Sequence, residues 1–136
     1  MIDIENQVFN TVRTALLAAY PEITVLNDRP EVQQKFPCVV LTQDDSADYR
    51  RGRTVAPVER FAEVMFTIDV YTAEISGGKT LAKNIADVAD RAMQNLYFSR
   101  MFFRETPNVD RKLKRFTARY RAVVEDTGNE YLFYRR

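Results

Sequence analysis

Hydrophobic residues recur at four-residue steps in two stretches of the chain, and this period predicts two amphipathic helices. The first stretch follows Asp3, a residue type that caps helix N-termini. It ends near Tyr20, because Pro21 lacks the amide hydrogen that a continuing helix needs. The second follows a turn at 76–78 and ends near Leu96. The apolar positions that share one face are Ile4, Val8, Val12, Leu16 and Tyr20 in the first helix and Leu81, Ile85, Val88, Ala92 and Leu96 in the second.

Six other stretches have the patterns of strands. The two clearest alternate apolar and polar residues over 59–72 and 114–125, so that one face packs on a core and the other meets water or a partner. Residues 38–41 are apolar throughout, which fits a strand buried on both faces. Three shorter strands are expected at 23–26, 98–105 and 131–134. The predicted order is therefore helix, three strands, helix, three strands.

This order favours the α+β class, with a mostly antiparallel sheet and two amphipathic helices packed on one face. A chain of 136 residues is long enough to bury one core, so we expect a single domain over residues 1–136. Residues 43–57, QDDSADYRRGRTVAP, are predicted to form a long charged loop. Connections of that length are usually functional or disordered.

The chain has no His, no Trp and a single Cys. The usual near-neutral proton carrier and the commonest metal ligand are therefore both absent. A Cys–His nucleophile is impossible, and Ser and Thr have no His to act as their base. Composition thus points away from an enzyme and toward a protein that works by shape and surface, with no cofactor.

Charge is unevenly distributed, although the formal net charge is only +1. Residues 1–68 carry 7 basic and 10 acidic side chains, a net of −3, and residues 69–136 carry 13 and 9, a net of +4. The most basic part, 100–121, has 8 Lys and Arg against 2 Asp and Glu. Such polarity can steer a partner or help one copy dock on another.

The opening MIDIENQVF is acidic and lacks the basic segment and apolar core of a secretory signal. No apolar run approaches the roughly 20 residues that cross a bilayer. We therefore expect a protein made in a reducing cytoplasm, in which Cys38 is a buried small hydrophobe.

Residues 73–80, AEISGGKT, lie between a predicted strand and a helix, where a phosphate-binding loop belongs. However, Ala73 stands where that motif has its first Gly, and the preceding strand is amphipathic rather than apolar throughout. A Gly-Gly turn followed by a solvated Lys79 is the favoured interpretation. The alternative is a nucleotide-dependent enzyme that uses Gly78, Lys79 and Thr80.

The tightest carboxylate cluster of the chain comprises Asp44, Asp45 and Asp48. Such a cluster could hold a divalent cation or act as an acid/base pair. It lacks the spaced ligand series and terminal Glu of a calcium loop. A solvated acidic segment beside the basic run RRGR at 50–53 is therefore favoured over a metal site.

The basic strand within 111–121 could bind nucleic acid, with Phe116 and Tyr120 stacking on bases. These aromatics differ in parity from Arg115, Arg119 and Arg121, so they face the opposite side of the strand. A base-stacking platform carries both on one face. The pattern therefore favours aromatics in a core and charges outside, with a DNA-binding module as the alternative.

Five segments together resemble a known family over nearly the full length: IENQVFNTVRTALLAAYP, FPCVVL, VMFTIDVYT, the helix after SGGKT, and RYRAVV with EYLFYRR. The chain resembles tail-terminator proteins of long-tailed bacteriophages and prophages, also called tail-completion or head–tail joining proteins. The resemblance implies a small α+β domain that assembles into a hexameric ring. It also implies a structural, non-enzymatic role in the virion, at the head-proximal end of the tail, after assembly in the host cytoplasm.

In that family the ring caps the tail tube, ends tube polymerisation and offers the head a joining surface. The implied partners are further copies of the chain, the tail tube protein and a head-completion or neck protein, with passive contact to DNA in the lumen and none with a membrane. Another neck or connector component, or a tail assembly factor, is the alternative within the same structural class.

For such a ring, the acidic first half and the basic second half would meet across a head-to-tail contact, which closes into a ring. The loop 43–57 and the charged side of the strand 114–125 supply the candidate residues. The candidate subunit or partner interface comprises Asp44, Asp45, Asp48, Tyr49, Arg50, Arg51, Arg53, Arg115, Arg119 and Arg121.

Overall fold

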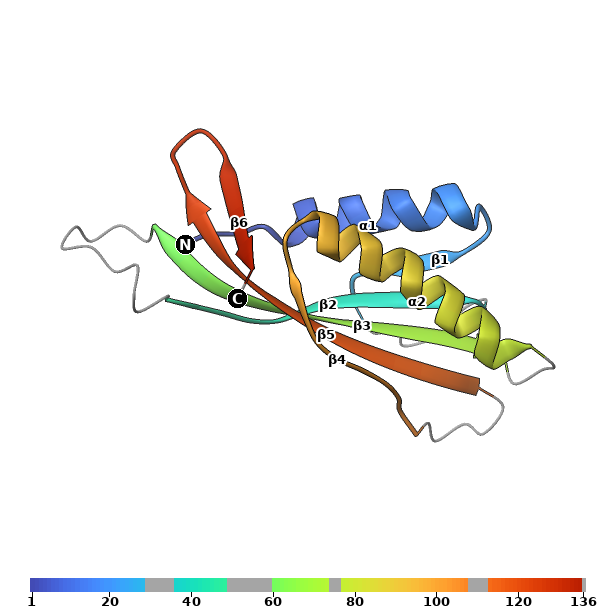
Figure 1. The fold of residues 1–136 in the computed structure, drawn as a ribbon. Coiled ribbons are helices and arrows are strands. Elements are labelled where there is room, and N and C mark those ends of the chain that lie inside the picture. Colours follow the sequence, from blue (N-terminus) through green and yellow to red (C-terminus); the bar gives the residue numbers. More distant parts are fainter. Residues whose placement is uncertain (29–35, 49–59, 74–76, 108–112, 136) are drawn as a thin grey trace.

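A long twisted sheet carries both helices on one of its faces (Figure 1). The computed structural model describes residues 1–28, 36–48, 60–73, 77–107 and 113–135. Its elements are α1 (Glu5–Ala19), β1 (Thr24–Leu26), β2 (Cys38–Asp48), β3 (Phe61–Ala73), α2 (Gly78–Asn95), β4 (Ser99–Glu105), β5 (Leu113–Asp126) and β6 (Tyr131–Arg135). The predicted element order and the α+β class are confirmed.

The strands lie in the order β1-β2-β3-β5-β4, and β6 also pairs with β5. Only β1 and β2 are parallel, and the remaining pairs are antiparallel, as predicted. The edge of β5 that faces away from β3 is shared, because β4 pairs with residues 116–121 and β6 pairs with residues 122–126. β5 is therefore held along both edges over most of its length.

The two faces of β3 and β5 differ in chemistry as their alternation predicts. Phe66 on β3 and Tyr120 on β5 are register partners and point toward the helices, where both are almost fully buried. Phe98 packs edge-to-face on Phe66 with ring centroids 5.6 Å apart. The Tyr120 hydroxyl donates a 2.7 Å hydrogen bond to Asp90 of α2, so the one polar atom of this ring has a partner. The aromatics of β5 are therefore core residues.

Helix α1 buries Val8, Val12 and Leu16 completely, in agreement with its predicted face. The prediction of Asp3 as N-cap is wrong by one residue, because Ile4 occupies that position. The Asp3 carboxylate instead accepts a 3.3 Å hydrogen bond from the amide of Glu5. It therefore still supplies an acceptor to a helix-terminal N–H that has no partner within the helix.

Helix α2 is rotated from its predicted orientation. Ile85 and Ala92 are buried as predicted, but Leu81, Val88 and Leu96 are only partly buried at the border of the core. The remaining buried positions are Gly78, Ala82, Ala86, Ala89 and Met93. Small side chains dominate the contact face because they let the helix backbone approach the sheet closely, and the larger residues then pack at the sides.

Strand β2 is longer than predicted. Residues 38–41 are all buried, as expected, but the strand continues to Asp48 and takes in the first six residues of the predicted loop 43–57. The polar residues of this extension pair with β3 after an irregularity between Gln43 and Asp45. They are accommodated because this half of β2 lies at the rim of the sheet, where side chains reach water. Residues 49–57 lie outside the described residues.

Cys38 is 2% exposed, and burial raises the pKa of its thiol. It is therefore the inert small hydrophobe that the sequence predicted. Neither helix in the described ranges is long and apolar enough to span a membrane.

Gly78 lies where the start of α2 closely approaches the end of β3. A Cβ at this position would overlap the carbonyl oxygen of Ala73, and the Thr72 hydroxyl donates a 2.9 Å hydrogen bond to the Gly78 carbonyl. Gly→Ala inside a helix normally stabilises by about 0.5–1 kcal/mol. We expect Gly78→Ala to destabilise instead, by about 1–3 kcal/mol, because of this overlap. Urea unfolding measures the change. The matched control is Thr80→Ala, an exposed position in the same turn of α2, which should be neutral or stabilising. An equally neutral Gly78→Ala would contradict the close packing of α2 on the end of β3.

Candidate assembly surface

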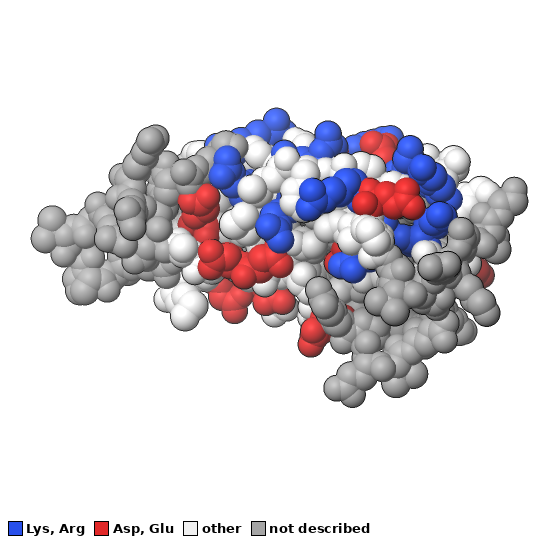
Figure 2. All heavy atoms as spheres, turned by 90° about the horizontal axis from the view of Figure 1, so that it is seen from below, with Lys and Arg blue, Asp and Glu red and all other residues white. Residues whose placement is uncertain are grey.

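The face of the sheet opposite the helices is polar and carries most of the predicted interface residues that the structure describes. Figure 2 views this face. Lys and Arg are spread over the side formed by β4 and β5, and Asp and Glu gather toward the end of the sheet where β2 finishes and β3 begins. On β5 the residues that point to this face are Arg115, Thr117, Arg119 and Arg121, which alternate with the core residues. The predicted separation of aromatics and charges on β5 is confirmed.

Asp69 is the centre of one polar cluster on this face. It is 5% exposed and accepts hydrogen bonds from Nε of Arg115, at 3.1 Å, and from the hydroxyl of Thr117, at 2.6 Å. Thr117 in turn accepts a 2.7 Å hydrogen bond from the hydroxyl of Thr106. The carboxylate therefore has both a charged partner and a neutral donor, which compensates for its removal from water.

Asp44 forms a second cluster with Arg119. It lies at the irregularity of β2, where it accepts a hydrogen bond from the Thr67 hydroxyl and lies 3.5 Å from Nε of Arg119. The Arg119 guanidinium is also 5.6 Å from the ring centroid of Phe102, and that of Arg104 is 4.5 Å from the same ring. Phe102 is thus an aromatic on the charged face that sequence parity on β5 alone did not reveal.

These contacts change the interpretation of the charge asymmetry. Asp44 and Arg119 come from the acidic and basic halves of the sequence, and they meet within one chain. Part of the asymmetry is therefore balanced within the fold itself, because the sheet places the acidic part of β2 within reach of β5 across β3.

The ten predicted interface residues fall into three groups. Asp44, Arg115 and Arg119 are paired within the chain, as described above. Asp45 is exposed, and Arg121 is partly buried with no acceptor for its Nε–H. Neither has an ion-pair partner among the described residues. The third group lies outside the described side chains and comprises Asp48, Tyr49, Arg50, Arg51 and Arg53.

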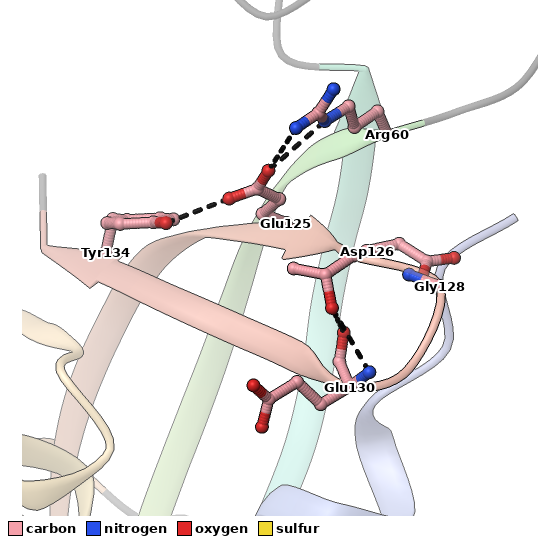
Figure 3. Close-up of polar contacts among 7 residues, drawn as sticks. Arg60, Glu125, Asp126, Gly128, Glu130 and Tyr134 are labelled. Carbon is pink, nitrogen blue, oxygen red and sulfur yellow. Dashed lines mark hydrogen bonds and ion pairs between the residues drawn. The ribbon is translucent and has the colours of Figure 1, made fainter.

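A further cluster, which the sequence did not suggest, ties β6 to the rest of the sheet (Figure 3). Arg60 donates two hydrogen bonds to Oε2 of Glu125, from Nε at 3.1 Å and from Nη2 at 2.9 Å. Tyr134 of β6 donates its hydroxyl to the other carboxylate oxygen at 2.8 Å. The hydrogen bonds from Tyr134 and Arg60 lower the pKa of Glu125, and the bond to Glu125 raises the pKa of Tyr134. One carboxylate thus joins β5, β6 and the start of β3.

An apolar groove of about 590 Å³ lies beside β6, between the N-terminal turn of α1 and the C-terminal end of α2. Tyr97, which has a positive φ of 64°, and Leu132 expose 60% and 37% of their surfaces there. Exposed apolar residues that gather in one place are typical of contact surfaces.

The remaining candidate motifs have local partners. Lys79 is solvated, as predicted, with 58% of its side chain exposed, and it also lies 3.6 Å from a carboxylate oxygen of Glu105, which contacts Lys114. The expected turn brings Gly77 into the left-handed conformation, at φ 86°, just before α2. Among the described residues, no group of three or more Cys, Asp or Glu side chains converges as a metal site would require.

Residues 8–125, from the first turn of α1 to the end of β5, match the family model described as tail completion protein gp17. This chain belongs to the tail completion protein family. The predicted resemblance to tail-completion and tail-terminator proteins, which are structural tail proteins, is therefore confirmed.

Among solved structures, one similar chain is a sheath/tube terminator of an extracellular contractile injection system in its extended state. It is 14% identical to this chain, with a TM-score of 0.49, over 93% of this chain and 58% of its own length. The chain thus spans little more than half the length of that terminator. A comparison with curated proteins gave no match.

The Asp69–Arg115 pair can be tested against an exposed pair of the same chemistry. Arg115→Met leaves the Asp69 carboxylate buried with only one neutral donor, so we expect a loss of about 3 kcal/mol in unfolding free energy. Arg91 also pairs with an Asp, but its side chain is 74% exposed, and Arg91→Met should cost about 0.5 kcal/mol or less. Chemical denaturation measures both variants. Equal losses would contradict a buried Asp69 that depends on Arg115.

The Glu125 cluster predicts a dependence of stability on pH. The pKa of Glu125 is lower in the folded chain than in the unfolded one, so its contribution is complete above the unfolded pKa and is lost as pH falls through the folded pKa. Glu125→Gln should therefore flatten the loss of stability in acid, measured by urea unfolding between pH 7 and pH 2. Glu130→Gln, in the same hairpin, is the control, because the described bonds of Glu130 use only its backbone. A Glu125→Gln profile parallel to wild type would contradict this assignment.

Proposed function

We propose that this tail completion protein forms a closed hexameric ring that caps the head-proximal end of the tail tube. The ring would end tube polymerisation and present the surface on which the head joins the tail. Membership of the tail completion family over residues 8–125 is the observation that carries this proposal. The protein would reside in the virion, after assembly in the host cytoplasm.

The chain would act by contact rather than catalysis. It contains no His, and its one Cys is buried. The most buried carboxylates of the described sheet, Asp69 and Glu125, form hydrogen bonds and ion pairs that hold strands together. These observations support a role in which charged groups serve stability and recognition.

Three surfaces are available for the partners of such a ring. The charges at Asp45 and Arg121, which have no ion-pair partner among the described residues, suit contacts between subunits. The apolar groove beside β6 suits a protein partner, either the tail tube protein or a head-completion or neck protein. The helix-free face, with Arg104 and Arg119 over Phe102, suits passive contact with DNA if it lines the lumen.

Sizing and tube assembly test the ring directly. Light scattering on the purified chain, alone and with tail tubes, should detect a particle of six copies of the 15.8 kDa chain. Addition during polymerisation of the tail tube protein should shorten the tubes in proportion to the amount added, with rings at one tube end in electron micrographs. Addition after polymerisation is the control, because it should cap tubes without changing their length.

Two outcomes would contradict this proposal. A chain that stays monomeric and leaves tube length unchanged would exclude a terminator ring. Absence of the chain from purified virions, measured by mass spectrometry, would instead identify a tail assembly factor.

A further inference from the structure

Two of the longer open edges of the described sheet, those of β2 and β4, lie on opposite sides of it. β1 covers only residues 38–40 of β2, so no described strand pairs with the outer edge of β2 from Leu41 to Asp48. No described strand pairs with the outer edge of β4, Ser99–Glu105, either. Each edge offers seven or eight residues, or about 25 Å of unpaired backbone N–H and C=O groups at about 3.3 Å per residue.

The two edges carry opposite unpaired charges on the same face of the sheet. Asp45 of β2 is the register partner of Met65, which pairs with Arg121, so Asp45 shares the helix-free face. Arg104 of β4 is the register partner of Thr117, which places it on that face too. Both side chains are exposed, and neither has an ion-pair partner among the described residues.

Charged residues on edge strands commonly prevent unwanted pairing. Here they do so selectively. Two β2 edges brought together would oppose Asp45 with Asp45, and two β4 edges would oppose Arg104 with Arg104. A β2 edge against a β4 edge can instead bring Asp45 and Arg104 together, so these two charges favour a head-to-tail contact over a symmetric dimer.

The strand directions fit the same contact. β4 runs antiparallel to β2 within one chain, since three antiparallel pairings separate them. A neighbour displaced across the sheet keeps that relation, so β4 would meet the neighbouring β2 antiparallel. Within one chain Arg104 is level with Asp69 of β3, and Asp45 is level with Met65. Bringing Arg104 opposite Asp45 of the next copy therefore also needs a shift along the strands of four residues, or about 13 Å at about 3.3 Å per residue. Met101 and Phe103, which expose 42% and 37% of their surfaces on β4, would gain cover from the neighbour.

We propose that copies of this chain join edge to edge, with β4 of one copy paired antiparallel to β2 of the next and Arg104 facing Asp45 of the neighbouring copy. This inference rests on the proposed ring and names the contact that builds it. The sheet then continues from copy to copy, with the helices of every copy on one side and the charged face on the other.

Charge reversal at the two edges tests this contact by light scattering. Arg104→Glu alone and Asp45→Arg alone should each lose ring formation, because each opposes like charges at every contact. Both changes in one chain should restore rings. An equimolar mixture of the two single variants should also form rings, with the variants alternating, since each edge then meets its complement.

Matched controls reverse exposed charges away from both edges. Arg13 on α1 and Glu22 in the turn after it are exposed, and Arg13→Glu and Glu22→Arg should both form rings as the wild type does. Circular dichroism establishes that each single-edge variant is folded, which the restored rings of the mixture would show independently.

Hydrogen exchange distinguishes strand pairing from a contact made by side chains alone. Amides in peptides covering 44–48 and 101–105 should exchange at least tenfold more slowly in wild-type rings than in the monomeric single variants. Rings that resist both charge reversals, or that leave these amides unprotected, would overturn the edge contact and leave the proposed function standing. A wild-type chain that forms no ring, alone or on tubes, would overturn both.

Discussion

The antiparallel ladder between β3 and β5 is the constraint on which the rest of the structure depends. It runs from Phe61 opposite Glu125 to Ala73 opposite Leu113 without a break in register. Because side chains alternate across a strand, this register sends Phe66 and Tyr120 to the helices and sends the arginines of β5 to the open face. A slip of one residue would exchange the two sets and would place guanidinium groups under α2. The hydrophobic core and the charged face are thus two consequences of one pairing.

The charged face then serves two purposes. Arg115 is held by Asp69 of the neighbouring strand β3, and Arg119 lies near Asp44 of β2, two strands away, so these charges contribute to the stability of the fold. The exposed charges without ion-pair partners among the described residues include Asp45 and Arg104, at the two open edges. Charges in the middle of the sheet therefore hold one chain together, and charges at its rims are suited to join chains, which is the arrangement that a tail completion protein needs if it builds a ring.

Much of the fold could be predicted because it follows from the spacing of apolar residues along the sequence. Alternation identified the strands around Phe66 and Tyr120, and four-residue spacing identified both helices. The rotation of α2 onto Ala82, Ala89 and Met93 could not be predicted, since it depends on how closely Gly78 lets the helix approach the sheet. The extension of β2 through Asp48 was hidden by its polar composition, which is typical of loops. The site was harder still, because the partners of Arg115 and Glu125 are set by register between strands far apart in the sequence, and five of the ten predicted interface residues lie outside the described side chains.

The central proposal is that this chain assembles through the edges of its sheet at the end of the tail tube. Electron cryo-microscopy of tubes capped by the wild-type chain tests it most directly. We expect a ring in which neighbouring sheets are continuous, with β4 at hydrogen-bonding distance from the next β2 and all helices on one side. A ring whose copies touch through α1 or α2, with the edges of β2 and β4 exposed to solvent, would contradict it.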